Sequence, residues 1–282
     1  MQDSILDKII RVLTPILVYL FANLFAQAGF TSFVMATRFK ALGGDRVSYA
    51  KGFSFVENME IIVKANTLTV TLIASVITII VLLYMFRKDF RSIVFVKPKS
   101  GFLCTIAVGI FASAGISKLV TLFPIDGILG NYSETSSNVF LADVPMQILT
   151  LIIVGPIMEE LLFRGMIYNR LKEMNESTIA AYLSAIIFGV YHLNLVQGIY
   201  TFILGFLLVY VYETYKSLAA PILLHMAANA VAVVMNYLPI SKVINGHWYF
   251  KLPVMLVEIG ILVVVTYFFV YNKNKKDNVM QQ

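Results

Sequence analysis

The sequence carries too little charge for a water-soluble protein. Only 13% of its 282 residues are charged, whereas about 25% is typical of a soluble domain. Apolar residues make up 59% of the chain and raise the mean hydropathy to +0.81. We therefore predict an integral membrane protein. The net charge of +6 does not favour nucleic-acid binding, because no soluble basic face is expected to carry it.

Cysteine and several familiar patterns are scarce or missing. Cys104 is the only cysteine, so no intramolecular disulfide can form, and its place in an apolar run favours a packing role. The sequence has no His-Glu-x-x-His motif and no evident internal repeat. It also lacks the short alternating segments of an outer-membrane barrel.

Long apolar runs recur almost to the end of the chain. They predict an all-α fold, a polytopic membrane helical bundle with about eight transmembrane helices. The expected spans are Ile9 to Phe30, Asn66 to Phe86, Phe102 to Phe123, Pro145 to Tyr168, Thr178 to Leu193, Val196 to Tyr212, Leu218 to Leu238 and Leu252 to Tyr271.

The distribution of lysine and arginine predicts the orientation. With the N-terminus inside, these residues are about twice as frequent in inner as in outer segments, so both termini are expected in the cytoplasm. A basic start, an apolar run and the Ala-x-Ala pattern ending at Ala28 imitate a cleavable signal peptide. A plausible helix continues from Gly29 to Ala36, however, which favours an uncleaved span in the cell membrane.

Three ionisable residues lie inside one expected span: Glu159, Glu160 and Arg164. Charged side chains at membrane depth are costly and usually functional. Residues four apart share a helix face, so Glu160 can reach Arg164 while Glu159 points elsewhere. This predicts an ion pair and a free carboxylate, with a static salt-bridge network as the alternative. Pro156 removes a backbone hydrogen bond just before the acids and predicts a kink.

Two of the three histidines, His192 and His225, also fall within apolar spans, whereas His247 has the character of an interfacial loop residue. Two buried histidines beside a buried acidic pair favour a shared site over separate packing roles.

The expected depths of these residues in the membrane support a single shared site. The charged turn 172–177 joins two antiparallel spans, and Glu159 and His192 lie at similar distances from it along the chain. His225 lies nine residues beyond Lys216, about 13 Å into the membrane from the same side. Asn229 follows one turn later on the same face. We therefore expect Glu159, His192, His225 and Asn229 to converge.

These residues form three motifs in a fixed order: Glu159-Glu160-x-x-x-Arg164, Phe188-x-x-x-His192 and His225-x-x-x-Asn229. The set resembles the motifs of the CPBP family, also called Abi, which comprises CAAX-processing and bacteriocin-processing intramembrane proteases. The resemblance covers roughly Met146 to Tyr237. It implies three parts: N-terminal transmembrane helices in 1–144, a catalytic helical core in 145–238, and a C-terminal helix with a cytoplasmic tail in 239–282.

The resemblance also implies roles for the motif residues. Glu159 and His192 are expected to activate water, His225 and Asn229 to stabilise the oxyanion, and Glu160 and Arg164 to support them. The implied activity is endopeptidase cleavage of a membrane-associated or lipidated peptide or protein, without a covalent intermediate. A carboxylate and an imidazole in an apolar cavity suit general-base hydrolysis, and a neutral amide suits an oxyanion.

The sequence leaves alternatives open for metal dependence and for the class of function. Glu159, His192 and His225 could supply three ligands of a catalytic zinc site, but no cysteine ligand or zinc motif accompanies them, and we expect a metal-free site. A non-catalytic bacteriocin self-immunity or scaffold protein of the same fold is the main alternative. A proton-coupled transporter is disfavoured because only one helix carries the charges. The expected partners are the substrate and the lipid bilayer.

Overall fold

Helices form almost all of the described chain. The computed structural model describes residues 4–38, 60–87, 102–120, 122 and 139–280, and no strand occurs within them. The predicted all-α fold is confirmed. Loop cations that contributed to the predicted orientation, such as Lys51 and Lys97, lie outside the described residues, so the orientation stays a prediction.

Seven helices in this part of the chain are long and apolar enough to cross a membrane. The main elements are α1 (Ile5–Arg38), α3 (Thr67–Met85), α5 (Phe102–Val120), α7 (Val144–Gln147), η1 (Ile148–Val154), α8 (Gly155–Leu162), η2 (Phe163–Tyr168), α9 (Asn169–Lys172), α10 (Ser177–Tyr191), α11 (Leu195–Tyr215), α12 (Ala219–Tyr237), α13 (Pro239–Gly246) and α14 (Trp248–Met280). Because seven helices can cross a membrane, the chain is a multi-pass membrane protein.

The fifth expected span, Thr178 to Leu193, is shorter than the others. It forms α10, whose 15 residues rise about 22 Å, less than the roughly 30 Å of a bilayer core. α10 ends in a tight turn, where glycine, asparagine and glutamine in 193–198 interrupt the apolar pattern and predict a hairpin. Leu193 adopts a positive φ of 52°, and Asn194 Oδ1 accepts a hydrogen bond from the Gln197 amide (3.1 Å) at the start of α11.

The stretch from Val144 to Lys172 is one continuous helix with two π-helical segments, η1 and η2. Such segments are rare and often occur at functional sites. η1 ends immediately before Gly155, whose amide bonds to the Thr150 carbonyl, and Pro156 follows within α8. A Cβ on Gly155 would lie 2.7 Å from that carbonyl oxygen, so the closely wound backbone favours glycine here.

Contacts divide the chain into two compact units. The first comprises Met1–Arg87 and Ser133–Met158, and the second Lys88–Tyr132 and Glu159–Gln282. In the first, α1 packs against α3 through a small cluster of Ala26, Val70 and Ala74. This division concerns packing, so the three-part organisation expected from the sequence stays a prediction.

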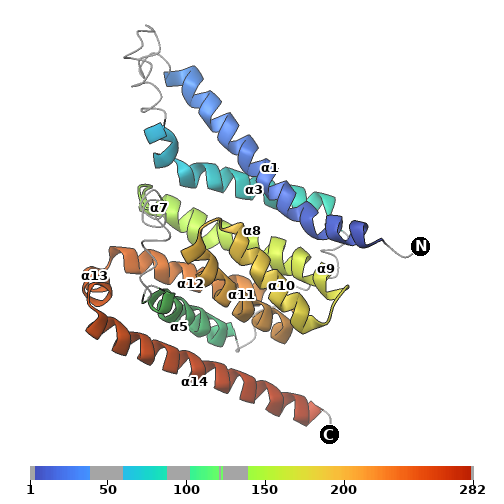
Figure 1. The fold of residues 1–282 in the computed structure, drawn as a ribbon, viewed down its shortest axis with the longest axis vertical. Helices are drawn as coiled ribbons and strands as arrows, with labels where there is room; N and C mark the ends of the chain where they lie inside the picture. Colours follow the sequence, from blue (N-terminus) through green and yellow to red (C-terminus); the bar gives the residue numbers. More distant parts are fainter. Residues whose placement is uncertain (1–3, 39–59, 88–101, 121, 123–138, 281–282) are drawn as a thin grey trace. The chain divides into compact units, whose positions relative to one another are not determined.

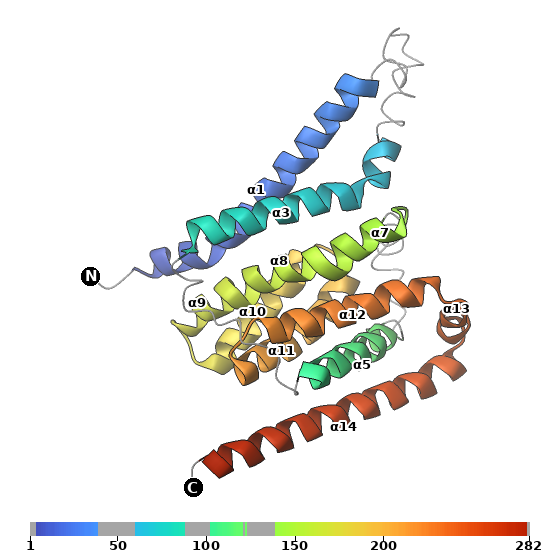
Figure 2. The ribbon, with the colours of Figure 1, turned by 180° about the vertical axis from the view of Figure 1, so that it is seen from behind.

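In the second unit α5 lies between α12 and α14, as Figures 1 and 2 show from opposite sides. A buried ion pair joins α5 to α14, because Lys118 Nζ lies 2.8 and 2.9 Å from the two carboxylate oxygens of Glu258. α10 and α11 form a close hairpin, in which a Cβ on Gly189 would lie 2.8 Å from the Gly198 carbonyl oxygen.

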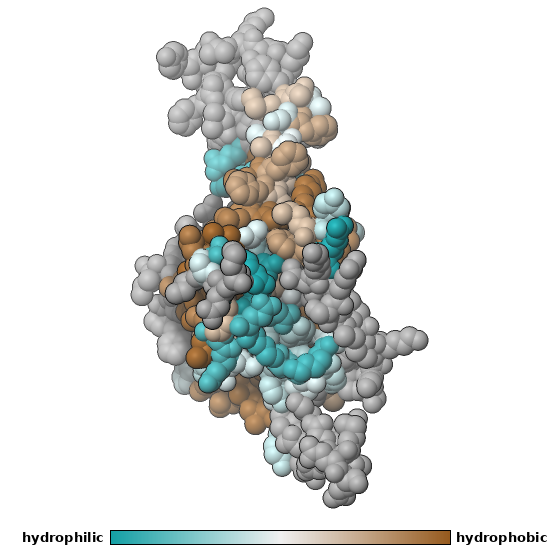
Figure 3. Space-filling model, turned by 90° about the vertical axis from the view of Figure 1, so that its right-hand side faces the viewer, coloured by the Kyte–Doolittle hydropathy of each residue, from teal (hydrophilic) through white to brown (hydrophobic). Residues whose placement is uncertain are grey.

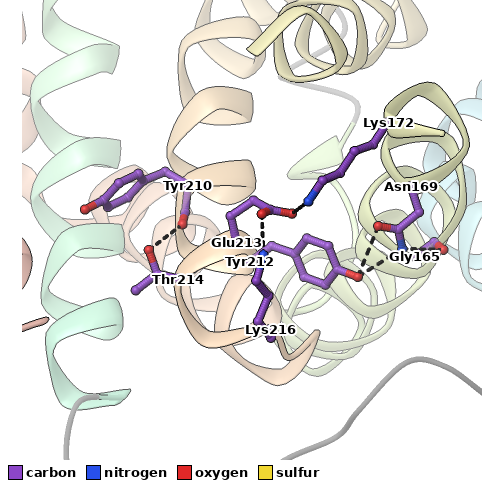
Figure 4. Close-up of polar contacts among 8 residues, drawn as sticks. All are labelled: Gly165, Asn169, Lys172, Tyr210, Tyr212, Glu213, Thr214 and Lys216. Carbon is purple, nitrogen blue, oxygen red and sulfur yellow. Dashed lines mark hydrogen bonds and ion pairs between the residues drawn. The ribbon is translucent and has the colours of Figure 1, made fainter. Parts of the chain in front are cut away.

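Polar contacts tie α9 to α11 near the charged turn before α10. Lys172 pairs with Glu213 (2.7 Å), which also pairs with Lys216, and Asn169 Nδ2 donates to Tyr212 Oη (2.9 Å) (Figure 4). Figure 3, which looks toward the end where α9 lies, shows hydrophilic residues gathered there beside hydrophobic surface. This is the end predicted to face the cytoplasm.

Candidate active site

The site is built by three helices of the second unit. Glu159, Glu160 and Arg164 lie on the helix through α8 and η2, His192 follows the last turn of α10, and His225 and Asn229 lie on α12. His225 contacts both glutamates, and Phe188 contacts both His225 and His192.

Glu160 and Arg164 form the ion pair that their spacing predicted. Arg164 Nη1 lies 3.0 Å from Glu160 Oε1, and neither side chain has any exposed surface. Arg164 Nη2 donates to the Gly205 carbonyl of α11 (3.1 Å), and the guanidinium lies over the Phe188 ring at 4.7 Å. The arginine is therefore fixed from three directions by α8, α10 and α11.

His225 lies between the two glutamates. Its Nδ1 donates to Glu160 Oε1 (2.8 Å), because a carboxylate only accepts, and its Nε2 lies 3.6 Å from Glu159 Oε2. The second distance exceeds a hydrogen bond. Glu160 therefore orients His225 as well as balancing Arg164, and the Glu159 side chain is the more accessible carboxylate, with 17% of its surface exposed.

His192 is oriented by its own helix. Its Nδ1 donates to the Phe188 carbonyl (2.8 Å), which leaves Nε2 of the neutral ring as a proton acceptor. The ring also packs edge-on against the rings of Phe188 and Tyr191. His192 therefore contributes a second basic nitrogen, Nε2, from the end of α10, the helix that packs against η2.

Asn229 is half-buried and lies one helical turn after His225 on α12. This is the position that its spacing predicted, and its role stays a prediction.

Phe188 is the residue whose importance sequence reasoning missed. Its buried ring contacts Arg164, His192 (5.0 Å between ring centroids) and His225 (5.9 Å). It thus packs against both imidazoles. Its place at the start of the second motif was the available signal, but its role at the centre of three helices depends on tertiary packing.

Carboxylate and imidazole side chains of this kind are potential metal ligands. Among the side chains that the structure describes, no three His, Cys, Asp or Glu residues form a group that could hold a metal ion. Glu159, His192 and His225 therefore do not fit the three-ligand arrangement of a catalytic zinc site.

A sequence model of the Rce1-like family, described as "Type II CAAX prenyl endopeptidase Rce1-like", matches residues 141–231. The resemblance to the CPBP family is confirmed for this segment. The Rce1-like segment contains all six charged, histidine and asparagine residues of the three motifs.

One curated protein supports the same relationship. "Putative membrane peptidase YdiL" of Bacillus subtilis (strain 168) is 31% identical over 116 residues, which are 40% of this chain and 48% of that protein. The chain thus matches about half the length of this relative. No solved structure matches the chain significantly.

Proposed function

We propose that the protein is an intramembrane endopeptidase that hydrolyses a peptide bond with water activated by Glu159 and His192. The observation that carries the proposal is that His225 lies between Glu160 and Glu159 while the Phe188 ring contacts both His225 and His192, with one nitrogen of each imidazole already bonded. Each ring therefore presents only Nε2 for chemistry.

Glu159 takes a proton from water in this proposal, and His192 Nε2 passes protons. Glu159 Oε2 and His225 Nε2 are 3.6 Å apart, so one water molecule lying beside them can contact both. Attack by that water on the peptide carbonyl gives a tetrahedral oxyanion, and proton transfer to the leaving amine completes cleavage.

His225 and Asn229 stabilise the oxyanion, and Glu160 and Arg164 support them. Glu160 fixes the His225 ring through Nδ1, so that the ring does not have to reorient when charge develops. The Asn229 amide adds a neutral donor without burying another charge.

The substrate class follows from the family match and the membrane location. We propose a membrane-associated or lipidated peptide or protein, reached from the cytoplasmic side. Water is needed at the site, and hydrophilic residues gather at the end near α9 (Figure 3), where the helix that carries Glu159 ends. Both termini are proposed to face the same compartment.

The test uses the purified full chain in liposomes with two internally quenched peptides. One carries a farnesylated C-terminal Cys-aliphatic-aliphatic-X sequence, and the other lacks the lipid. Glu159→Gln removes the base and keeps the shape, so cleavage should fall by roughly 10² to 10⁴-fold. Glu176→Gln makes the same change at an exposed position before α10 and should leave cleavage unchanged.

Undiminished cleavage by the Glu159→Gln variant would overturn the mechanism. If wild-type protein cleaves neither peptide, membrane peptides from cells with wild-type and Glu159→Gln protein are compared by mass spectrometry. Identical peptide sets would favour the non-catalytic immunity or scaffold role.

A further inference from the structure

Helix α5 lies outside the matched segment, yet it packs directly against the backbone that carries two site residues. A Cβ on Gly109 would lie 2.3 Å from the carbonyl oxygen of Leu224 and 3.1 Å from the Ala227 side chain. The α5 and α12 backbones therefore approach as closely as only glycine permits. Leu224 is the residue immediately before His225.

The same relation is repeated one turn later. Ser113, which is 2% exposed, donates its hydroxyl hydrogen to the Ala228 carbonyl oxygen (2.8 Å). Ala228 immediately precedes Asn229. The Tyr200 hydroxyl of α11 in turn donates to Ser113 Oγ (3.1 Å), which fixes the direction of the serine hydroxyl.

We infer that Gly109 and Ser113 are positioning residues that set the depth and rotation of α12, and through it the placement of His225 and Asn229. The inference rests on the proposed function for its kinetic part. Carbonyls at i and i+4 lie on one helix face, so contacts at Leu224 and Ala228 hold α12 at two points one turn apart. A helix held at two such points can neither slide nor rotate freely.

The catalytic geometry has little tolerance for such movement. The His225 to Glu160 hydrogen bond is 2.8 Å long, and hydrogen bonds of this type extend to about 3.2 Å. A shift of a few tenths of an ångström in α12 therefore changes this bond and the aim of Asn229 together. A misplacement of about 1 Å can cost on the order of 10²-fold in rate.

Ser113→Ala is the informative variant because it is expected to fold. The Ala228 carbonyl still belongs to helix α12, and the substitution removes no charged group. No buried charge therefore loses its partner. Gly109→Ala is more severe, because the new Cβ meets backbone that cannot give way. The matched control is Ser117→Ala, the same change one turn later on α5 at an exposed position.

The first measurement is kinetic, with the farnesylated and unlipidated quenched peptides. Ser113→Ala should lower kcat about 10-fold with KM unchanged, since positioning acts on the transition state. Ser117→Ala should match wild type. Tyr200→Phe should have a smaller effect and add little in combination with Ser113→Ala, because its contact acts through the serine.

The second measurement does not depend on proteolysis. The chain has three histidines, so selective ¹⁵N-histidine labelling gives three imidazoles, which His→Gln variants assign. Ser113→Ala should shift the His225 ring signals and leave those of His247, in the segment between α13 and α14, in place. Ser117→Ala should shift neither.

Unchanged His225 signals in Ser113→Ala would overturn the inference, whatever the peptides show. Equal shifts of all histidines would also overturn it, because they would indicate general loosening. Absence of cleavage by wild-type protein, together with a selective His225 shift, would leave the positioning role standing and count against the proposed function alone.

Discussion

The sharpest test of the site compares the free energy of unfolding of variants at its two adjacent glutamates, Glu159 and Glu160. Glu160 Oε1 accepts hydrogen bonds from Arg164 Nη1 (3.0 Å) and His225 Nδ1 (2.8 Å), with no part of the side chain exposed. In Glu160→Gln the amide oxygen can still accept both bonds. The shape is kept and only the charge is lost, so the guanidinium becomes an unbalanced buried cation.

An unbalanced buried charge costs roughly 3 to 5 kcal/mol. Arg164 keeps the Gly205 carbonyl and the Phe188 ring face, which favours the lower end of that range, about 3 kcal/mol. Glu159 has no arginine partner in the described structure, and its nearest histidine nitrogen is 3.6 Å away. Glu159→Gln should therefore change the free energy of unfolding by less than about 1 kcal/mol.

The assay is reversible unfolding of the purified protein by SDS in mixed micelles, followed by circular dichroism. Wild type, Glu159→Gln, Glu160→Gln and the double variant Glu160→Gln with Arg164→Gln are compared. The double variant should recover part of the loss, because it removes both charges. Equal stability of the Glu160→Gln variant and wild type would refute the ion-pair reasoning.

Three further predictions address roles that the structure leaves to experiment. Asn229→Ala should lower kcat by a factor on the order of 100 with little change in KM, as expected for an oxyanion donor; an effect on KM alone would reassign it to substrate binding. Protein stripped with chelator should keep its activity and bind no metal by elemental analysis, whereas recovery only on addition of zinc would contradict the metal-free site. In a Cys104→Ser background, Glu176→Cys should react with a membrane-impermeant thiol reagent only from the cytoplasmic side and Leu193→Cys only from outside; the reverse pattern would invert the topology.

Features that depend on one helix could be predicted from the sequence. Apolar length gave the spanning helices to within a few residues at many of their ends, and i,i+4 spacing gave the pair Glu160 and Arg164. The turn after α10 was also predicted, because glycine, asparagine and glutamine interrupt the apolar pattern there.

Features that depend on contacts between helices could not be predicted from the sequence. The sequence predicted one site for Glu159, His192, His225 and Asn229, but spacing along a helix does not show which atoms of different helices lie opposite one another. The structure places Glu159 beside His225 and gives Glu160 two partners. The same limit applied to Lys118 and Glu258, whose pairing across α5 and α14 could not be decided from depth alone.

The backbone irregularities escaped prediction for a different reason. Nothing in the residue pattern of Ile148–Val154 or Phe163–Tyr168 distinguishes a π-helical from an α-helical turn, since both segments are compatible with either type of helix. The short helix α13 was also missed, because its eight residues are too few for a spanning signal.

In the helix that contains η2, the number of residues is more tightly constrained than the identity of the apolar residues, because contacts on both sides of η2 must form together. Arg164, near the start of η2, is held by the Gly205 carbonyl, while Asn169 and Lys172 just beyond it are held by Tyr212 and Glu213 of the same partner helix (Figure 4). Loss of one residue between them would shift one end by about 1.5 Å and rotate it by about 100° relative to the other. Both sets of contacts could not then form together. We therefore expect substitution of one apolar residue for another within η2 to be tolerated. Insertion or deletion of a single residue should be selected against.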